Sequence, residues 1–358
     1  MKIHNFSAGP SILAPEVFQE AAQAVVNFQD TGLSLLEMSH RSKEFDAVLN
    51  EAISLVNELL ELPDGFKAIF VSGGASTQFA LAPMNLLPQN GKAAYINTGT
   101  WADKAIKEAK AFGNIDVVAS SKEDNYTHIP KNYSVPSDAA FFHITSNNTV
   151  FGTQFRNMPE TSVPLVVDMS SDIFSYKVDM EKIGLIYAGA QKNMGPAGTT
   201  LIVVREDLLG KVDRHIPSMF DYRIHIKKNS AYNTPPVFPI YVSMLNLRWV
   251  KKNGGIKAME ARSIARSEMI YSEVDRNPLF RGTTAVEDRS RMNATFVLNE
   301  KYQSLENDFL EVCKNAGISG IKGHRSVGGF RASMYNAMEL DSVQVLVDVM
   351  KDFEERKG

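Results

Sequence analysis

The sequence predicts an α/β protein with two parts: a large domain, built on a mostly parallel seven-stranded sheet flanked by helices, and a smaller α+β C-terminal domain. Seven short apolar runs lie between residues 67 and 204, and several are separated by helix-like stretches. This alternation is typical of a parallel sheet whose two faces are both covered by helices. The sequence beyond residue 257 mixes helix-like and strand-like stretches without strict alternation, which predicts the second domain.

The first part of the chain is expected to be helical. Residues 16–30 and 44–62 both space their apolar side chains as one face of a helix. Pro63-Asp64-Gly65 follows the second stretch and is expected to end it, because proline and glycine disfavour a continuing helix. A further helix is expected over residues 101–112, between two of the apolar runs.

The seven apolar runs are the expected strands of the large sheet. They are KAIFV (67–71), AAYIN (93–97), DVVAS (116–120), AAFFHIT (139–145), PLVVD (164–168), LIYAG (185–189) and TLIVV (200–204). The last run follows its predecessor after too few residues for a helical crossover. These two strands are therefore expected to be antiparallel.

The C-terminal part is expected to contain a helix over residues 257–274, strand-like stretches around 292–298 and 330–335, and a final helix over 341–358. The predicted large domain spans residues 16–257. The predicted small domain spans residues 258–358 together with 1–15.

Composition limits the classes of function. The 358 residues carry a formal net charge of -3 and no block of lysine and arginine, which argues against nucleic acid and membranes as partners. The single cysteine, Cys313, excludes an intrachain disulfide framework and a cysteine-rich metal site, and no metal is expected. The N-terminus lacks the apolar stretch of a signal peptide, and no run of about 18 apolar residues occurs. A cytoplasmic location is therefore expected.

Small residues after the first expected strand suggest an anion site. Gly73 to Thr77 follow the strand end at Val71 and precede a helix-like stretch. Backbone N–H groups at a helix N-terminus bind phosphate well, and Ser76 and Thr77 add hydroxyls. The loop matches neither GxGxxG nor a Walker motif, so ATP and dinucleotides are not indicated. A tight strand-to-helix turn explains the same residues equally well.

Three more residues follow the carboxyl ends of expected strands, where open α/β sheets bind ligands: Trp101, Asp168 and Lys192. Each has an ordinary explanation, as a core side chain, a helix cap and a surface lysine respectively. Together with the loop at Gly74 to Thr77 they offer pyridoxal phosphate a stacking face, an acid for its ring nitrogen, an amine for an imine and a phosphate site. A Schiff-base aldolase, the other imine chemistry, would need no phosphate loop combined with a ring partner.

Two His-Arg pairs indicate an acidic substrate. His40-Arg41 lies in EMSHRSKEF, and His324-Arg325 lies in IKGHRSVGGFRASMYNA, which also contains Arg331. Arginine binds carboxylate or phosphate through two parallel N–H bonds. Each arginine alone is explained as a surface residue. As a set, they indicate a substrate with a carboxylate at one end and a carboxylate or phosphate at the other.

Over essentially its full length the chain resembles the phosphoserine aminotransferase family, within the fold type I, class V enzymes that use pyridoxal phosphate. The matching segments are NFSAGPSILAPEV, MSHRSKEF, GGASTQF, INTGTWADKA, HITSNNTVFGTQF, DMSSD, YAGAQKNMGPAG, YNTPPVFPIY and GHRSVGGFRASMYNA. The whole set is specific to the family, whereas no single segment would be.

The resemblance implies roles for individual residues. Lys192 resembles the Schiff-base lysine, Asp168 the partner of the pyridine nitrogen, and Trp101 the stacking residue. The other implied cofactor ligands are Thr149 at the ring hydroxyl, Ala75, Ser76 and Gln191 at the phosphate, and Asn233 and Thr234 from the neighbouring subunit. The implied substrate ligands are Ser7, Arg331 at the α-carboxylate, and His40, Arg41, His324 and Arg325 at the distal acid group, some of them from across the dimer. A homodimer with shared active sites follows from this resemblance. Ser76 stands where some relatives carry an arginine, so a contribution of this loop to binding the substrate phosphate is left open.

The implied reaction transfers an amino group between L-glutamate and 3-phosphohydroxypyruvate, giving O-phospho-L-serine and 2-oxoglutarate in serine biosynthesis. Use of 3-hydroxy-2-oxo-4-phosphooxybutanoate, in pyridoxine biosynthesis, stays open. Three alternatives remain. A cysteine desulfurase needs a mobile cysteine, and Cys313 in an expected helix is a poor candidate. An alanine–glyoxylate-type transferase would not need two His-Arg pairs. A non-enzymatic binding module would not need both Lys192 and Asp168.

Overall fold

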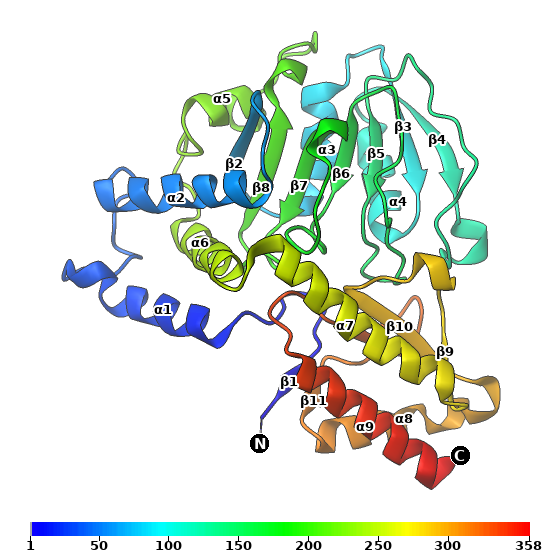
Figure 1. The fold of residues 1–358 in the computed structure, drawn as a ribbon. Helices are drawn as coiled ribbons and strands as arrows, with labels where there is room; N and C mark the ends of the chain where they lie inside the picture. Colours follow the sequence, from blue (N-terminus) through cyan, green and yellow to red (C-terminus); the bar gives the residue numbers. More distant parts are fainter. Residues whose placement is uncertain (1) are drawn as a thin grey trace.

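The computed structural model describes residues 2–358 and contains the expected large sheet, with strand order β2-β8-β7-β6-β5-β3-β4 (Figure 1). The strands are β2 (Phe66–Ser72), β3 (Lys92–Asn97), β4 (Asn114–Ser120), β5 (Phe142–Thr145), β6 (Leu165–Asp168), β7 (Ile183–Gly189) and β8 (Thr199–Arg205). Strands β4, β3, β5, β6 and β7 are parallel to one another, and β8 runs antiparallel to both β7 and β2. The predicted fold class and the antiparallel pair are confirmed.

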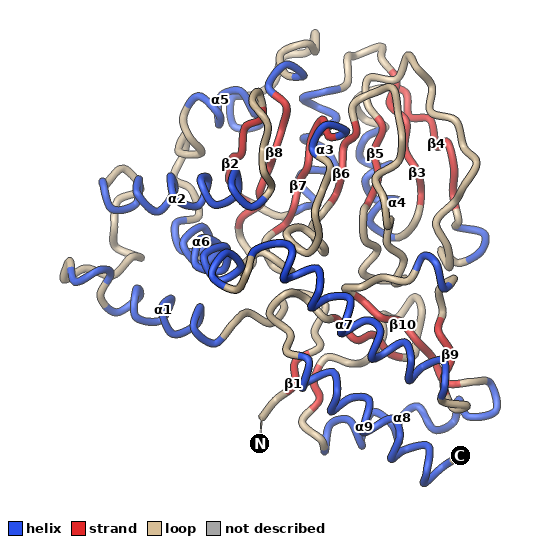
Figure 2. Tube along the Cα trace, in the orientation of Figure 1, coloured by secondary structure: helices blue, strands red, loops and turns tan. Residues whose placement is uncertain are grey.

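Helices pack on both faces of this sheet (Figure 2). They are α1 (Pro15–Val26), α2 (Lys43–Leu59), α3 (Ala75–Leu86), α4 (Thr100–Ala109), α5 (Tyr222–Lys227) and α6 (Val237–Lys252). Successive side chains of β7 point to opposite faces: Leu185 and Tyr187 pack with α3, α4 and α5, whereas Ile186 and Ala188 pack with α1, α2 and α6. Because both faces are buried, the strands carry unbroken apolar runs rather than alternating ones.

The first expected helix is shorter than predicted. The helix expected over residues 16–30 ends at Val26, where Asn27 adopts an extended conformation with φ -157°. The Asn27 side chain accepts a hydrogen bond from the Gly32 backbone N–H at 2.9 Å. Asparagine stabilises turns by such local bonds, which compete with continuation of a helix.

The C-terminal part forms a small α+β unit. Its antiparallel sheet has the order β12-β10-β9, with β9 (Phe280–Gly282), β10 (Asn293–Leu298) and β12 (Phe330–Ser333). Its helices are α7 (Gly255–Arg276), α8 (Glu306–Asn315) and α9 (Leu340–Lys357). The N-terminal strand β1 (His4–Asn5) returns to this unit and pairs in parallel with β11 (Ile318–Ser319).

The division into two domains stays a prediction, and two apolar clusters support it. One cluster draws on residues between Leu13 and Met259, and another joins Phe6 to residues between Ile270 and Phe353. The predicted boundary at 257/258 falls in the first turn of α7, which contributes to both clusters. Among residues 2–358, no helix is both long enough and apolar enough to cross a membrane.

Candidate active site

The carboxyl ends of β3, β5, β6 and β7 lie along one edge of the large sheet, because these four strands are adjacent and parallel. Trp101 lies in the first turn of α4, after β3, and Thr149 follows β5. Asp168 ends β6, and Lys192 follows the end of β7. The topology therefore gathers these four side chains at the edge where α/β proteins bind ligands.

The Lys192 side chain points into the protein and is 9% exposed. Its Nζ donates a hydrogen bond to Thr149 Oγ1 at 2.6 Å and lies 5.5 Å from the centroid of the Trp101 ring. The N-terminal segment covers it: Ser11 Oγ donates to the Lys192 carbonyl, and a Cβ on Gly9 would lie 3.1 Å from Lys192 Cγ. A surface lysine at a strand end does not explain this burial.

Burial lowers the pKa of Lys192 to about 8; the Asp168 carboxylate opposes this shift, and the Arg331 guanidinium adds to it. Half a pH unit below its pKa, about a quarter of an amine population is neutral. A neutral amine can accept a proton or attack a carbonyl carbon, which an ammonium group cannot do.

We expect the Lys192 amine to titrate near pH 8 in cofactor-free protein. Its reaction with an amine-selective reagent, followed by mass spectrometry over a pH series, should show a midpoint near that value. The matched control is exposed Lys177, because its hydrogen bond to Glu61 raises its pKa. Arg331→Gln should move the Lys192 midpoint upward, since removal of a positive charge favours the ammonium form. A Lys192 midpoint no lower than that of Lys177 would contradict this assignment.

Asp168 is 5% exposed, and one of its carboxylate oxygens accepts hydrogen bonds from within the protein. Its Oδ1 accepts hydrogen bonds from the Ser170 backbone N–H at 3.0 Å and from Ser170 Oγ at 2.6 Å. Burial raises the pKa of Asp168, while the bonds from Ser170 and the charge of Lys192 oppose the shift. No described residue donates a hydrogen bond to Asp168 Oδ2, so this oxygen is available to a donor on a ligand.

Ser170 belongs to the candidate site through its bonds to Asp168, and the sequence interpretation missed it. Its Oγ also accepts from the Gly189 backbone N–H at 3.1 Å, which ties the turn after β6 to the end of β7. The signal for it was present, because an aspartate commonly accepts from the backbone two residues later in a turn.

The expected phosphate loop lies next to Gln191. Gly74 is the N-cap of α3 and provides no side-chain cap, so the first N–H groups of this helix have no side-chain acceptor from that position. A Cβ on Gly189 would lie 2.9 Å from Gln191 Oε1 and 3.1 Å from the Ala75 backbone nitrogen. Gln191 and the start of α3 therefore converge over Gly189, and Ser76 is exposed in the same turn. A helix N-terminus with such donors favours a phosphate group.

Cationic residues of the C-terminal part reach this edge. Arg331 on β12 donates from Nη1 to the Thr149 carbonyl at 3.2 Å, and its Nε is buried without a partner among the described residues. Burial lowers the pKa of His324, and the charges of Arg331, Arg325 and Lys104 lower it further. Arg331, Arg325 and Lys104 therefore form one positive cluster around His324, whose ring is mostly neutral at pH 7. Lys104, which sequence reasoning missed, lies 4.7 Å from the centroid of the Trp101 ring.

Within residues 2–358, five predicted residues have no direct polar link to Lys192, to Asp168 or to the positive cluster: Ser7, His40, Arg41, Asn233 and Thr234. No hydrogen bond or ion pair links any of them to Lys192 or Asp168 in the part of the chain that the structure describes. Asn233 Nδ2 instead donates to the Thr234 carbonyl at 3.0 Å, and Ser7 donates its backbone N–H to Asn5. Their assigned roles stay predictions.

Known proteins are similar to this chain in both sequence and fold. The family model for class V aminotransferases matches residues 3–346. A phosphoserine aminotransferase of Flavobacterium psychrophilum is 62% identical and covers 99% of this chain and 100% of its own length. The solved phosphoserine aminotransferase from Bacillus circulans has a TM-score of 0.96 at 45% identity, covering 100% of this chain and 99% of that one. A PLP-bound phosphoserine aminotransferase from Trichomonas vaginalis has a TM-score of 0.93 at 36% identity, covering 98% and 100%. With a matching family model along nearly all of its length, the chain belongs to the class V aminotransferases.

Proposed function

We propose that this chain is a pyridoxal-phosphate-dependent transaminase that moves an amino group between L-glutamate and 3-phosphohydroxypyruvate, giving O-phospho-L-serine and 2-oxoglutarate. The observation that carries the proposal is the buried Nζ of Lys192, which donates a hydrogen bond to Thr149 Oγ1 beside the Trp101 ring. The name phosphoserine aminotransferase, carried by a relative of 62% identity, supports this pair of substrates.

The residues at this edge fit pyridoxal phosphate. Asp168 Oδ2 is available for the ring N–H, and the Trp101 indole lies close to Lys192, with its Nε1 buried and without a partner among the described residues. Gln191 and the N-terminus of α3 are placed for the phosphate group. When bound, the cofactor supplies an aldehyde that bonds to amines and a ring that accepts the electron pair released at the substrate carbon.

The protein side chains divide the remaining work. Lys192, with a pKa lowered to about 8, can take the substrate α-proton and return it. The Asp168 carboxylate favours a protonated ring nitrogen, because an opposite charge at close range stabilises the cationic form. Arg331, through its free Nε, binds the α-carboxylate. Both half-reactions use the same positive cluster, which accepts the distal carboxylate of glutamate and the phosphate of the oxo acid in turn.

A cysteine desulfurase is disfavoured by the position of the thiol. Cys313 is buried in α8, and burial raises its pKa to about 12, so the thiolate needed for that chemistry is scarce at neutral pH. The free thiol also fits a reducing compartment, and a cytoplasmic location is part of our proposal.

The experiment that tests this function is a coupled assay of the purified protein with glutamate. Turnover of 3-phosphohydroxypyruvate should exceed that of unphosphorylated hydroxypyruvate by at least about 100-fold in kcat/KM, since a charge-assisted contact is worth roughly 1.5–3 kcal/mol and several act together. Arg41→Ala should reduce this preference, with Lys43→Ala as the neighbouring control. Equal turnover of both oxo acids would overturn the proposed substrate.

We also propose a homodimer in which Asn233 and Thr234 complete the partner's site. Mixing refolded Lys192→Ala and Thr234→Ala subunits should then restore activity, because each hybrid dimer contains one site with both residues intact. Random pairing gives half hybrids, so about a quarter of the wild-type rate is expected. Each variant refolded alone serves as the control. A mixture no more active than the more active control would argue that each site is built from one chain.

A further inference from the structure

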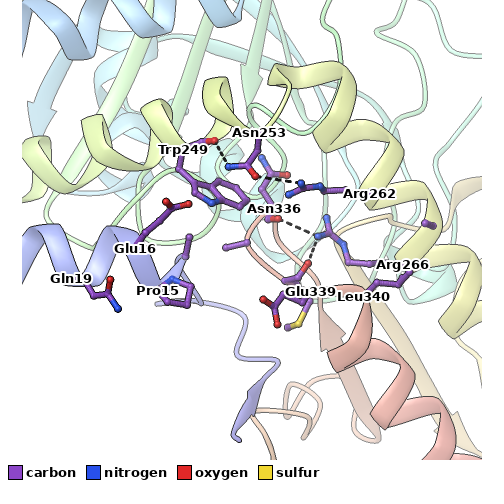
Figure 3. A pocket seen from close by; sticks show the side chains of 14 residues that line it. Pro15, Glu16, Gln19, Trp249, Asn253, Arg262, Arg266, Asn336, Glu339 and Leu340 are labelled. Atoms are coloured by element: carbon purple, nitrogen blue, oxygen red, sulfur yellow. Dashed lines mark hydrogen bonds between the residues drawn. The ribbon is translucent and has the colours of Figure 1, made fainter.

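A cavity of about 650 Å³ lies between α1, α6, α7 and the segment 336–340, which leads into α9 (Figure 3). None of the residues placed at the Lys192 edge lines it. A volume of this size is typical of small-molecule sites. Its walls come from both apolar clusters, since α1 and α6 belong to one and segment 336–340 adjoins the other.

Arg266 is a buried cation in the wall of this cavity. The residue is 1% exposed. Its Nη1 donates to the backbone carbonyls of Asn336, at 3.2 Å, and Met338. Its Nε and Nη2 are buried and have no hydrogen-bond partner among residues 2–358. Figure 3 shows the guanidinium reaching from α7 toward Asn336, among the other residues that line the cavity.

No described carboxylate neutralises this guanidinium. Two glutamates line the cavity, but Glu16 pairs with Lys252 at 2.9 Å and Glu339 pairs with Lys2. Burial lowers the pKa of Arg266 to about 10, and Arg262 contributes, so the group is still cationic at neutral pH. A buried cation with unmet N–H groups is unfavourable, and an anion with two acceptor oxygens would satisfy both needs.

The other polar groups of the cavity narrow the chemistry of that anion. Asn336 Oδ1 is also buried without a partner among the described residues, and it needs a donor. Arg262 lies on the rim, 5.8 Å from the centroid of the Trp249 ring. The planar fork of Arg266 matches a single carboxylate, and the carboxylates of Glu16 and Glu339 disfavour a dianion such as phosphate more than a monoanion.

We propose that this cavity binds a small carboxylic acid with an amino or hydroxyl group next to its carboxylate. Arg266 Nε and Nη2 and Asn336 Oδ1 are closed to water in the structure, so these two side chains turn toward the cavity when the acid binds. The carboxylate then lies on Arg266 Nε and Nη2, and the amino or hydroxyl group donates to Asn336 Oδ1. The site is separate from the Lys192 edge and does not depend on the proposed transaminase reaction.

Calorimetric titration of the cofactor-loaded protein tests this site with four probes: glycine, glycolate, acetate and inorganic phosphate. Glycine or glycolate should bind with a dissociation constant on the order of 1 mM. Whichever of the two binds more tightly identifies the neighbouring group as amino or hydroxyl. Acetate should bind at least about fivefold more weakly, since it leaves Asn336 Oδ1 unmet, and phosphate should not compete.

Two variants separate this cavity from the active site. Ala265→Trp should fill the cavity from the exposed face of α7 and weaken probe binding by more than about tenfold. Ala261→Trp, on the same helix but outside the cavity, is the matched control. Arg266→Met should give a similar loss to Ala265→Trp. Because Arg266 also holds the turn at Asn336, the Ala265 variant keeps the test valid if Arg266→Met fails to fold. Absence of binding by glycine and glycolate, or binding unchanged in Ala265→Trp, overturns the proposal.

Discussion

Replacing Lys192 with alanine is expected to lower kcat by at least about 10⁴-fold, because in the proposed function this one side chain is both the amine that bonds to the cofactor and the group that moves the proton. The cofactor should still bind, since Asp168, Trp101 and the N-terminus of α3 are unchanged, but without a covalent link. Coupled turnover assays measure the loss of activity. Borohydride reduction followed by mass spectrometry tests for the missing link.

The matched control for this variant is Lys177→Ala. Lys177 is exposed and pairs with Glu61, and surface pairs contribute little to stability. Wild-type turnover and covalent cofactor attachment are expected there. Substantial turnover by Lys192→Ala would remove this residue from its proposed role, whatever its burial.

Replacing Asp168 with asparagine is expected to lower kcat by about 10²–10³-fold, the usual effect of removing one preorganised electrostatic contact. The side chain keeps its shape but loses the charge that favours a protonated ring nitrogen. The same change should move the labelling midpoint of Lys192 below about 8, because in the unchanged protein the Asp168 carboxylate raises the pKa of that amine. Cofactor retention on dialysis should also fall.

Asp138→Asn is the control for the second prediction. Asp138 is exposed and pairs at 3.0 Å with Lys92, the first residue of β3, whereas Trp101 follows the opposite end of that strand. Its loss should leave both the rate and the Lys192 midpoint unchanged. If Asp168→Asn retained wild-type kcat and cofactor affinity, the contact between this carboxylate and the ring nitrogen would be ruled out.

Much of the large sheet could be predicted from sequence, since its strands other than the edge strand β4 are largely buried on both faces and therefore appear as short apolar runs. Burial on all sides also made α6 difficult to predict from the sequence. Every residue from Ile240 to Leu247 is buried, so the helix has no polar face and no amphipathic period to detect. The end of α1 was also missed, because a local bond of the Asn27 side chain decides it.

The candidate site divides in a similar way. Asp168 and Lys192 could be found because each stands just after an apolar run, at a position that the parallel sheet turns toward one edge. Lys104 could not be singled out, since a lysine in the first turns of an amphipathic helix is ordinary until its neighbours are known. The contact from Arg331 to the Thr149 carbonyl likewise joins segments that are far apart in the chain.

The sequence by itself determined the strand pattern and the residue types at the strand ends, because a buried strand appears as a short apolar run and each side chain's chemistry is given by its residue type. Only the tertiary structure decided the state of the Lys192 amine. The segment around Gly9 and Ser11 covers it, Asp168 attracts it, and Arg331 repels it. These effects depend on distance through space and on exclusion of water, and neither quantity is written in the spacing of residues along the chain.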